Sequence, residues 1–151
     1  MENANARELF HILNRRFSLL NKTCCKVGDL DLSSVQSHIV FEVDRRHQPS
    51  MQQIAETLGV DITTFSRQVQ TLIKMNLLKK TPDAADRRVY ILSLTTEGKI
   101  AADSIDHQMN TQLDEIFSHM SEFEKETVIR SIKLLNEAMA KSSPCCVTPI
   151  G

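Results

Sequence analysis

The sequence "DITTFSRQVQTLIKMNLLKKTPDAADRRVYILSLTTEG", residues 61–98, runs from a helical hydrophobic pattern directly into a strand-like one. At about 100° per residue, the first half places apolar residues on one arc and polar or cationic residues on the opposite arc. The apolar arc holds Ile62, Phe65, Val69, Leu72 and Ile73, and the polar arc holds Thr63, Arg67, Gln70, Thr71 and Lys74. The pattern predicts an amphipathic helix with Asp61 as its N-cap and one face free to contact a partner.

The second half of this stretch has the pattern of a β-hairpin. Residues 76–81, NLLKKT, and 88–94, RVYILSL, are rich in apolar residues, and the second run alternates with period two. Residues 82–87, PDAADR, lie between them and readily form turns. We therefore expect a hairpin with Arg87 and Arg88 near its tip, where their side chains could reach phosphates or a narrow minor groove.

Two shorter helices are expected before residue 61. Ser33 with Gln36, and Ser50 with Gln53, have the spacing of capping boxes, which satisfy backbone N–H groups at a helix start. Gly59 is the expected left-handed cap at the end of the second helix. Two helices joined by a short turn, the second with a polar and cationic outer face, form a helix-turn-helix.

Longer amphipathic helices are expected on both sides of this unit. Residues 4–24 repeat apolar residues at steps of three and four, and so do two further helices between residues 95 and 141. These positions are Leu9, Phe10, Leu13, Phe17 and Leu20 in the first helix, and Ile105, Met109, Leu113, Ile116, Met120, Val128, Ile132, Leu135 and Met139 in the others. A small winged domain cannot cover so much apolar surface, so we expect a helical homodimer interface.

Composition and charge narrow the class of protein. With 151 residues the chain is expected to form a single domain, and its apolar runs are too short for a membrane span. The first ten residues lack a secretion signal, which favours the cytoplasm. Residues 61–99 hold seven basic and four acidic residues, a charge of +3, so the rest of the chain carries −4 of the total of −1. A basic centre of this kind suits a polyanionic partner.

The sequence offers little for an enzyme. Its four glycines form no phosphate-cradling loop, and it has no nucleophile elbow or convincing acid–base pair. The five histidines show no metal-ligand motif. We therefore expect a binding protein that requires no cofactor.

The order of these elements, together with residues 62–98, closely resembles the MarR family of bacterial winged helix-turn-helix regulators. The most specific pieces are the Asp86-Arg87-Arg88 wing, the Leu94-Thr95 pair and Gly98. The resemblance implies a mainly α fold with a small β-wing, in a homodimer that binds a pseudo-palindromic operator in double-stranded DNA, usually as a repressor. It divides a single MarR-type domain, 1–151, into a winged helix-turn-helix core at about 33–98, dimerisation helices at 4–24 and 99–141, and a cysteine-containing tail at 142–151.

The resemblance also implies which residues contact DNA. By position, the major-groove residues are Thr63, Thr64, Ser66, Arg67 and Gln68, and Arg88 is the minor-groove arginine of the wing, beside Arg87 and braced by Asp86. The residue types fit these roles, because arginine can bind guanine edges or phosphate and glutamine can read adenine. Threonine and serine can contact phosphate oxygens or a thymine methyl group.

Four cysteines form two adjacent pairs, Cys24-Cys25 near the end of the first helix and Cys145-Cys146 in the tail. The resemblance implies that these two ends belong to one helical layer of the dimer, where the pairs could meet. Thiolates select soft ions, so the cysteines are candidates for binding a thiophilic metal or metalloid that releases the operator.

Other interpretations of the cysteines remain open at this stage. The thiols could instead oxidise or react with electrophiles and close a disulfide between the tail and the first helix. A buried cysteine can also be a small apolar residue without a sensing role. Because members of the family are also switched by small phenolic ligands, an aromatic molecule in the dimer cleft is a third possibility.

Overall fold

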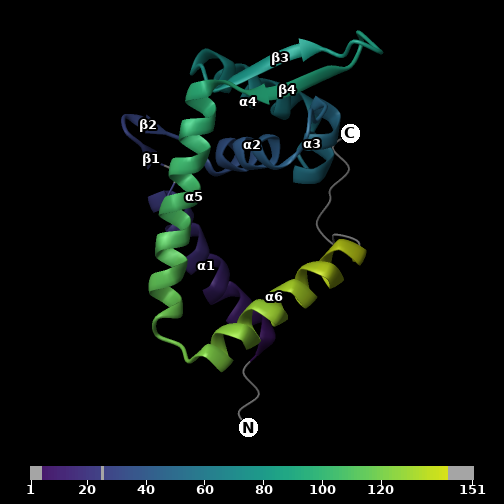
Figure 1. Cartoon of the computed structure of the whole chain (residues 1–151). Helices are drawn as coiled ribbons and strands as arrows, with labels where there is room; N and C mark the ends of the chain where they lie inside the picture. Colours follow the sequence, from purple (N-terminus) through teal and green to yellow (C-terminus); the bar gives the residue numbers. More distant parts are fainter. Residues whose placement is uncertain (1–4, 25, 143–151) are drawn as a thin grey trace. The chain divides into compact units, whose positions relative to one another are not determined.

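The computed structural model of the chain describes residues 5–24 and 26–142 (Figure 1). It is mainly helical, with short antiparallel strands. The elements are α1 (Ala6–Cys24), β1 (Lys26–Val27), β2 (Leu30–Asp31), α2 (Ser34–Arg45), α3 (Met51–Leu58), α4 (Ile62–Lys74), β3 (Leu78–Pro82), β4 (Tyr90–Leu94), α5 (Thr96–Phe117) and α6 (Glu122–Lys141). The chain divides into two compact units, with the boundary after Thr111.

The predicted helix starts are confirmed by their caps. At the start of α2, Ser33 Oγ accepts the N–H of Gln36 at 3.2 Å, and the Ser33 N–H donates to Gln36 Oε1 at 3.0 Å. Ser50 and Gln53 make the same reciprocal pair at α3, and Ser121 makes one with the third residue of α6. Gly59 ends α3 in the left-handed conformation, with φ of 64°, as its position predicts.

The core of the first unit lies between α2, α3, α4 and the β3–β4 hairpin, which pack side by side (Figure 1). Its largest fully buried side chains are Phe65, Ile39, Ile54, Leu72, Leu77, Leu92, Val40 and Val69. The predicted apolar arc of α4 therefore packs inward at its centre. Ile62 is an exception, because this first residue of α4 lies beyond the edge of the core and stays 55% exposed.

The hairpin forms where the alternating pattern predicts it. Strands β3 and β4 pair antiparallel from Leu78 opposite Leu94 to Pro82 opposite Tyr90. The N–H of Leu92 also donates to the Pro49 carbonyl at 2.9 Å, so the loop before α3 adds to the same sheet. Because Leu92 is fully buried, this strand is fixed to the core while the tip of the hairpin extends beyond it.

A glycine is required where the hairpin passes into α5. Thr95 Oγ1 donates to the carbonyl of Asn76 at 2.7 Å and accepts the N–H of Gly98 at 2.9 Å. A Cβ atom at Gly98 would overlap the backbone oxygen of Leu77. The Leu94-Thr95 and Gly98 pieces of the sequence therefore close the hairpin on the end of α4 and start α5.

One element was not predicted from the sequence. Strands β1 and β2 form a two-residue ladder, with Lys26 opposite Asp31 and Val27 opposite Leu30, around a turn at Gly28 with φ of 58°. Two residues per strand are too few to show a period of two, so the pattern gives no signal.

The outer helices keep much of their apolar surface uncovered. In α1 the exposed large apolar residues are Leu9, Phe10, Leu13, Phe17 and Leu19, and in α6 they are Phe123, Ile129, Ile132, Leu134 and Met139. Helix α6 has no buried residue at all along its described length. Within the part of the chain that is described, no helix combines the length and apolar character that a membrane crossing needs.

Candidate nucleic-acid interface

The start of α4 is fixed by a carboxylate that caps the helix. Asp61 Oδ1 accepts the N–H groups of Thr63 and Thr64 at 3.1 and 3.0 Å, and its Oδ2 accepts the Thr64 hydroxyl at 2.7 Å. The Thr64 hydroxyl and then its N–H hold the pKa of the Asp61 carboxyl below its ordinary value, because they stabilise the charged form. The proton of the Thr64 hydroxyl is thus engaged, and the group offers lone pairs and a methyl group outward.

The other residues expected to contact the major groove are arranged around the outer side of α4. Thr63 and Arg67 are exposed, while Ser66 and Gln68 are partly buried at the two flanks of the helix. Because Phe65 is completely buried on the opposite side, the helix cannot rotate to bury these groups. The α4 surface therefore presents hydroxyls, one guanidinium and one amide, which are groups that can contact base edges and phosphates.

An amide from α2 reaches this surface, and the residue pattern alone did not identify it. Gln36 Nε2 donates a hydrogen bond to Gln68 Oε1 at 3.1 Å. The same Gln36 side chain closes the capping box at the start of α2. Its capping role was visible in the sequence, but its contact with a residue 32 positions further on depends on how α2 packs against α4.

Asp86 orients one arginine of the wing through several hydrogen bonds. Arg88 donates from Nε to Asp86 Oδ1 at 3.1 Å and from Nη2 to Oδ2 at 3.2 Å, and its own N–H also donates to Oδ1. Hydrogen bonds from Arg88 hold the pKa of the Asp86 carboxyl below its ordinary value. The Arg88 side chain is nevertheless 91% exposed, so the guanidinium is oriented by Asp86 and remains accessible.

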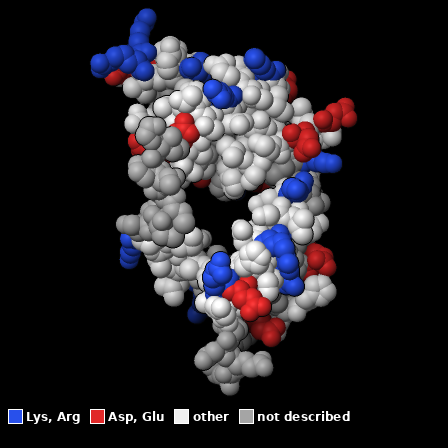
Figure 2. Space-filling model, turned by 180° about the vertical axis from the view of Figure 1, so that it is seen from behind, with Lys and Arg blue, Asp and Glu red and all other residues white. Residues whose placement is uncertain are grey.

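Positive charge gathers on the surface of the winged helix. The exposed basic residues of α4 and of the hairpin are Arg67, Lys74, Lys79, Arg87 and Arg88. Figure 2 shows lysine and arginine at the tip of the hairpin and along the adjoining edge. Lys80 is held against the wing by stacking its ammonium over the Tyr90 ring, 4.3 Å from the centroid. This edge has the charge and shape to approach a polyanion.

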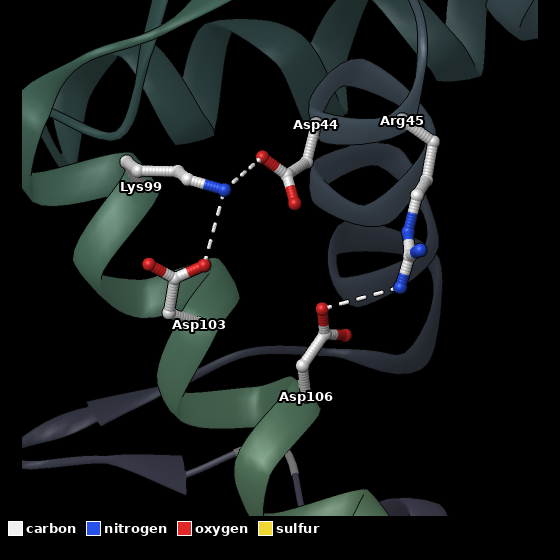
Figure 3. A network of polar contacts seen from close by, with 5 residues as sticks. All are labelled: Asp44, Arg45, Lys99, Asp103 and Asp106. Carbon is white, nitrogen blue, oxygen red and sulfur yellow. Dashed lines mark hydrogen bonds and ion pairs between the residues drawn. The ribbon is translucent and has the colours of Figure 1, made fainter.

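Ion pairs connect the winged helix to the first part of α5 (Figure 3). Lys99 Nζ lies 2.8 Å from Asp44 Oδ1 and 3.1 Å from Asp103 Oδ1, and Arg45 pairs with Asp106 at 3.3 Å. The hydrogen bonds that Lys99 donates to Asp44 and then to Asp103 raise the pKa of Lys99 above its ordinary value. Asp44 is mostly buried, so α5 is tied to α2 at its first turn.

The proposed sensing cysteines are not brought together by any described contact. Cys145 and Cys146 lie outside the described residues, as do Cys25 and the side chain of Cys24, whose backbone ends α1. Among the described residues, no group of three or more His, Cys, Asp or Glu side chains could hold a metal ion. The sensing role of the cysteines therefore stays a prediction.

A cavity of about 700 Å³ lies near the end of α1. The described residues that line it are Ser18, Asn21, Lys22, Lys26, Asp31, Leu32, Ser33 and Ser34, from α1, the β1–β2 ladder and the start of α2. Its surface is mixed apolar and polar, with two lysines, and its volume is in the range of small-molecule sites.

Comparisons with known proteins find one matching family model and several similar proteins. The model of the MarR family matches residues 32–90. The chain is 25% identical over 142 residues to the HTH-type transcriptional regulator YxaD of Bacillus subtilis, covering 91% of this chain and 98% of that protein. In structure it is similar to Streptococcus pneumoniae FabT, solved in complex with DNA, with a TM-score of 0.77, 19% identity and coverage of 89% of this chain and 94% of FabT.

A second solved structure has the same fold. The PcaV transcriptional regulator of Streptomyces coelicolor, solved with its natural ligand, gives a TM-score of 0.72 at 20% identity, with coverage of 90% of this chain and 94% of PcaV. At such identities the similarity establishes the winged helix architecture, which the element order in Figure 1 shows independently.

Proposed function

The chain belongs to the MarR family of DNA-binding transcriptional regulators, and we propose that it acts as a homodimeric repressor on a pseudo-palindromic operator. Regulators of this family bind DNA and are not enzymes. The observation that carries the proposal is the exposed Arg88, oriented by Asp86 at the tip of a hairpin that follows an exposed polar helix face.

In this proposal α4 enters the major groove and the wing follows the backbone into the adjacent minor groove. Thr63, Thr64, Ser66, Arg67 and Gln68 contact base edges or phosphates. Arg87 and Arg88 at the wing meet phosphates or the narrow minor groove, whose negative potential attracts arginine. The bidentate bond to Asp86 lowers the conformational entropy that Arg88 loses on binding.

The homodimer is supported by the uncovered apolar faces of the outer helices. Phe10 is 48% exposed and Phe17 is 41% exposed on α1, and Leu134 is 67% exposed on α6. A second copy can cover such faces and place the winged helices of the two subunits at half-sites about 34 Å apart, one helical turn of DNA. A C₂ dimer therefore matches a pseudo-palindrome.

DNA binding is tested by a salt series with the full-length protein. Affinity for an operator from its own promoter region should fall steeply with salt, because bound lysines and arginines release phosphate counterions. Arg67→Ala should reduce operator affinity, whereas Arg130→Ala removes an equal charge outside the proposed DNA-contacting surface, from a side chain of α6 that is 83% exposed, and should not. Equal, salt-independent binding by all three proteins would contradict the proposal.

For the signal, we propose that a thiophilic metal or metalloid at Cys24, Cys25, Cys145 and Cys146 releases the operator. The support is chemical, since vicinal thiols bind soft ions. An ion bound among the dimerisation helices would alter the separation of the two winged helices of the dimer. Operator binding by the reduced protein is titrated with arsenite, cadmium, zinc and peroxide. Release by a metal, lost in the Cys145→Ser/Cys146→Ser variant, supports this signal, and release by peroxide alone supports the oxidant alternative.

A small aromatic inducer is the second candidate, favoured by the cavity near the end of α1. Its two lysines, Lys22 and Lys26, suit a ligand that carries an acidic group. Replacing all four cysteines separates the candidates, because a small-molecule switch should survive that change and a thiol switch should not.

A further inference from the structure

The side-chain amide of Gln36 is bonded at both ends, and this fixes its orientation. Its Oε1 accepts the backbone N–H of Ser33 at 3.0 Å, and its Nε2 donates to Gln68 Oε1 at 3.1 Å. A backbone N–H can only donate, so Gln36 must present oxygen to Ser33 and nitrogen to Gln68. The oxygen and nitrogen of a side-chain amide have similar shapes, so the hydrogen-bond network decides which position each atom takes.

The orientation of Gln68 follows from that of Gln36. Gln68 receives a donor from Gln36, so it must turn its oxygen toward α2 and its nitrogen away from it. Within the described residues, the Gln68 amide nitrogen makes no hydrogen bond. Gln68 is partly exposed and lies one helical turn beyond Thr64, on the same face of α4.

We propose that Gln36 is a positioning residue that presents Gln68 to DNA as a hydrogen-bond donor, and so selects guanine at one base pair of each half-site. The inference rests on the proposed insertion of α4 into the major groove. Guanine offers two adjacent acceptors there, O6 and N7, which an amide NH₂ group can meet. Adenine needs the glutamine oxygen to face its N6 amino group, and the bond from Gln36 turns that oxygen toward α2 instead.

This differs from what the residue type alone suggests. A free glutamine turns its amide either way and pairs well with adenine N6 and N7. Here the direction is transmitted from the Ser33 backbone through Gln36 to Gln68. The base preference of the recognition helix is thus set in part by a capping residue of the preceding helix.

One substitution tests the proposal by reversing the orientation of the Gln68 amide. In Gln36→Glu the new carboxylate still accepts the Ser33 N–H, so the capping box is kept, but it cannot donate to Gln68. Gln68 must then turn its nitrogen inward and its oxygen toward DNA. The full-length dimer is used to select from an operator library with every position randomised. Enrichment of guanine over cytosine and adenine at one position should fall by roughly tenfold or more relative to wild type.

A matched control makes the same chemical change elsewhere. Gln53 closes the capping box of α3 in the same way, accepting the Ser50 N–H at 3.0 Å, without a bond to α4. Gln53→Glu adds the same charge and should leave the base preferences at wild type. Gln68→Ala should abolish the guanine preference at the same position that Gln36→Glu alters.

A second variant covers the case in which Gln36→Glu does not fold. Gln36→Met keeps the length of the side chain and frees the Gln68 amide to turn, so discrimination between guanine and adenine should weaken. Unchanged base preferences in a folded Gln36 variant, or in Gln68→Ala, would overturn the inference. A wild-type protein that enriches no sequence would overturn the proposed function itself.

Discussion

Helices α4 and α6 have similar amphipathic patterns but differ in what covers their apolar faces. In α4, Phe65, Val69 and Leu72 are completely buried by the core of the winged helix. In α6 no described residue is buried, and Ile132 remains 45% exposed. Hydrophobic periodicity thus identifies an apolar face, but it does not distinguish a face that the chain's own core covers from one that the described residues leave exposed.

The largest expected effect is on the folding of the winged helix, whose core is formed by residues of one chain. Phe65→Ala removes a fully buried ring and should lower the free energy of unfolding by about 3–5 kcal/mol, through lost transfer energy and a residual cavity. Urea unfolding followed by circular dichroism measures it. Ile62→Ala in the same helix is the control, because Ile62 is 55% exposed and should cost much less. Equal losses would mean that the difference in burial between Phe65 and Ile62 does not set the cost.

The outer helices should respond in assembly more than in folding. Phe10 on α1 is 48% exposed, and covering the rest of a phenylalanine side chain contributes about half of the 1.5–3 kcal/mol for full burial. A symmetric dimer loses this twice, so Phe10→Ala should raise the dimer dissociation constant roughly 10- to 100-fold. Sedimentation over a dilution series measures it.

Tyr90→Ala provides the control for that experiment. Tyr90 is an aromatic residue with a similar exposure of 41%, but it lies on the wing, outside the proposed interface. Its loss should leave the dissociation constant unchanged. An effect as large as that of Phe10→Ala would argue that the dimer forms through the wing.

A smaller effect, on operator affinity, is expected at the wing, because its exposed arginines are proposed to contribute to DNA binding and not to the core. Arg88→Ala should weaken operator binding by about 1–3 kcal/mol if the guanidinium enters the minor groove. Asp86→Asn keeps the arginine charge but weakens its orientation, so it should weaken binding less. Fluorescence anisotropy at several salt concentrations measures both. Unchanged affinity of Arg88→Ala at every salt concentration would remove the wing from DNA binding.

Local chemistry explains why much of the fold could be predicted from the sequence. The capping boxes at Ser33 and Ser50 and the left-handed Gly59 depend on residues within three positions of each other, so their spacing reveals them. The wing was predicted because the alternation in β4 and the turn residues before it are also local. The β1–β2 ladder was missed because two residues cannot establish a period.

The remaining features depend on contacts between distant residues. Gln36 meets Gln68 across 32 positions, and Lys99 meets Asp44 across 55, so neither pairing leaves a spacing signal. The exposure of Ile62 likewise reflects where the core ends and not the helical angle of the residue. Residue type and helical face can therefore nominate α4 for binding, while the orientation of its side chains requires the packed structure.

The smallest predicted effect concerns the ion pairs that join the covered winged helix to α5. Bonds to Asp44 and Asp103 raise the pKa of Lys99, so they stabilise the fold while the lysine is charged. This contribution is fully present below pH 10.5, the ordinary lysine value, and is lost as pH rises through the raised value in the folded state. The unfolding free energy of Lys99→Met should therefore lie below that of wild type by a constant small amount from pH 6 to 9, and the two should converge in more alkaline solution. Parallel urea titrations across this range measure the difference, and a gap that changes between pH 6 and 9 would assign the effect to a group other than Lys99.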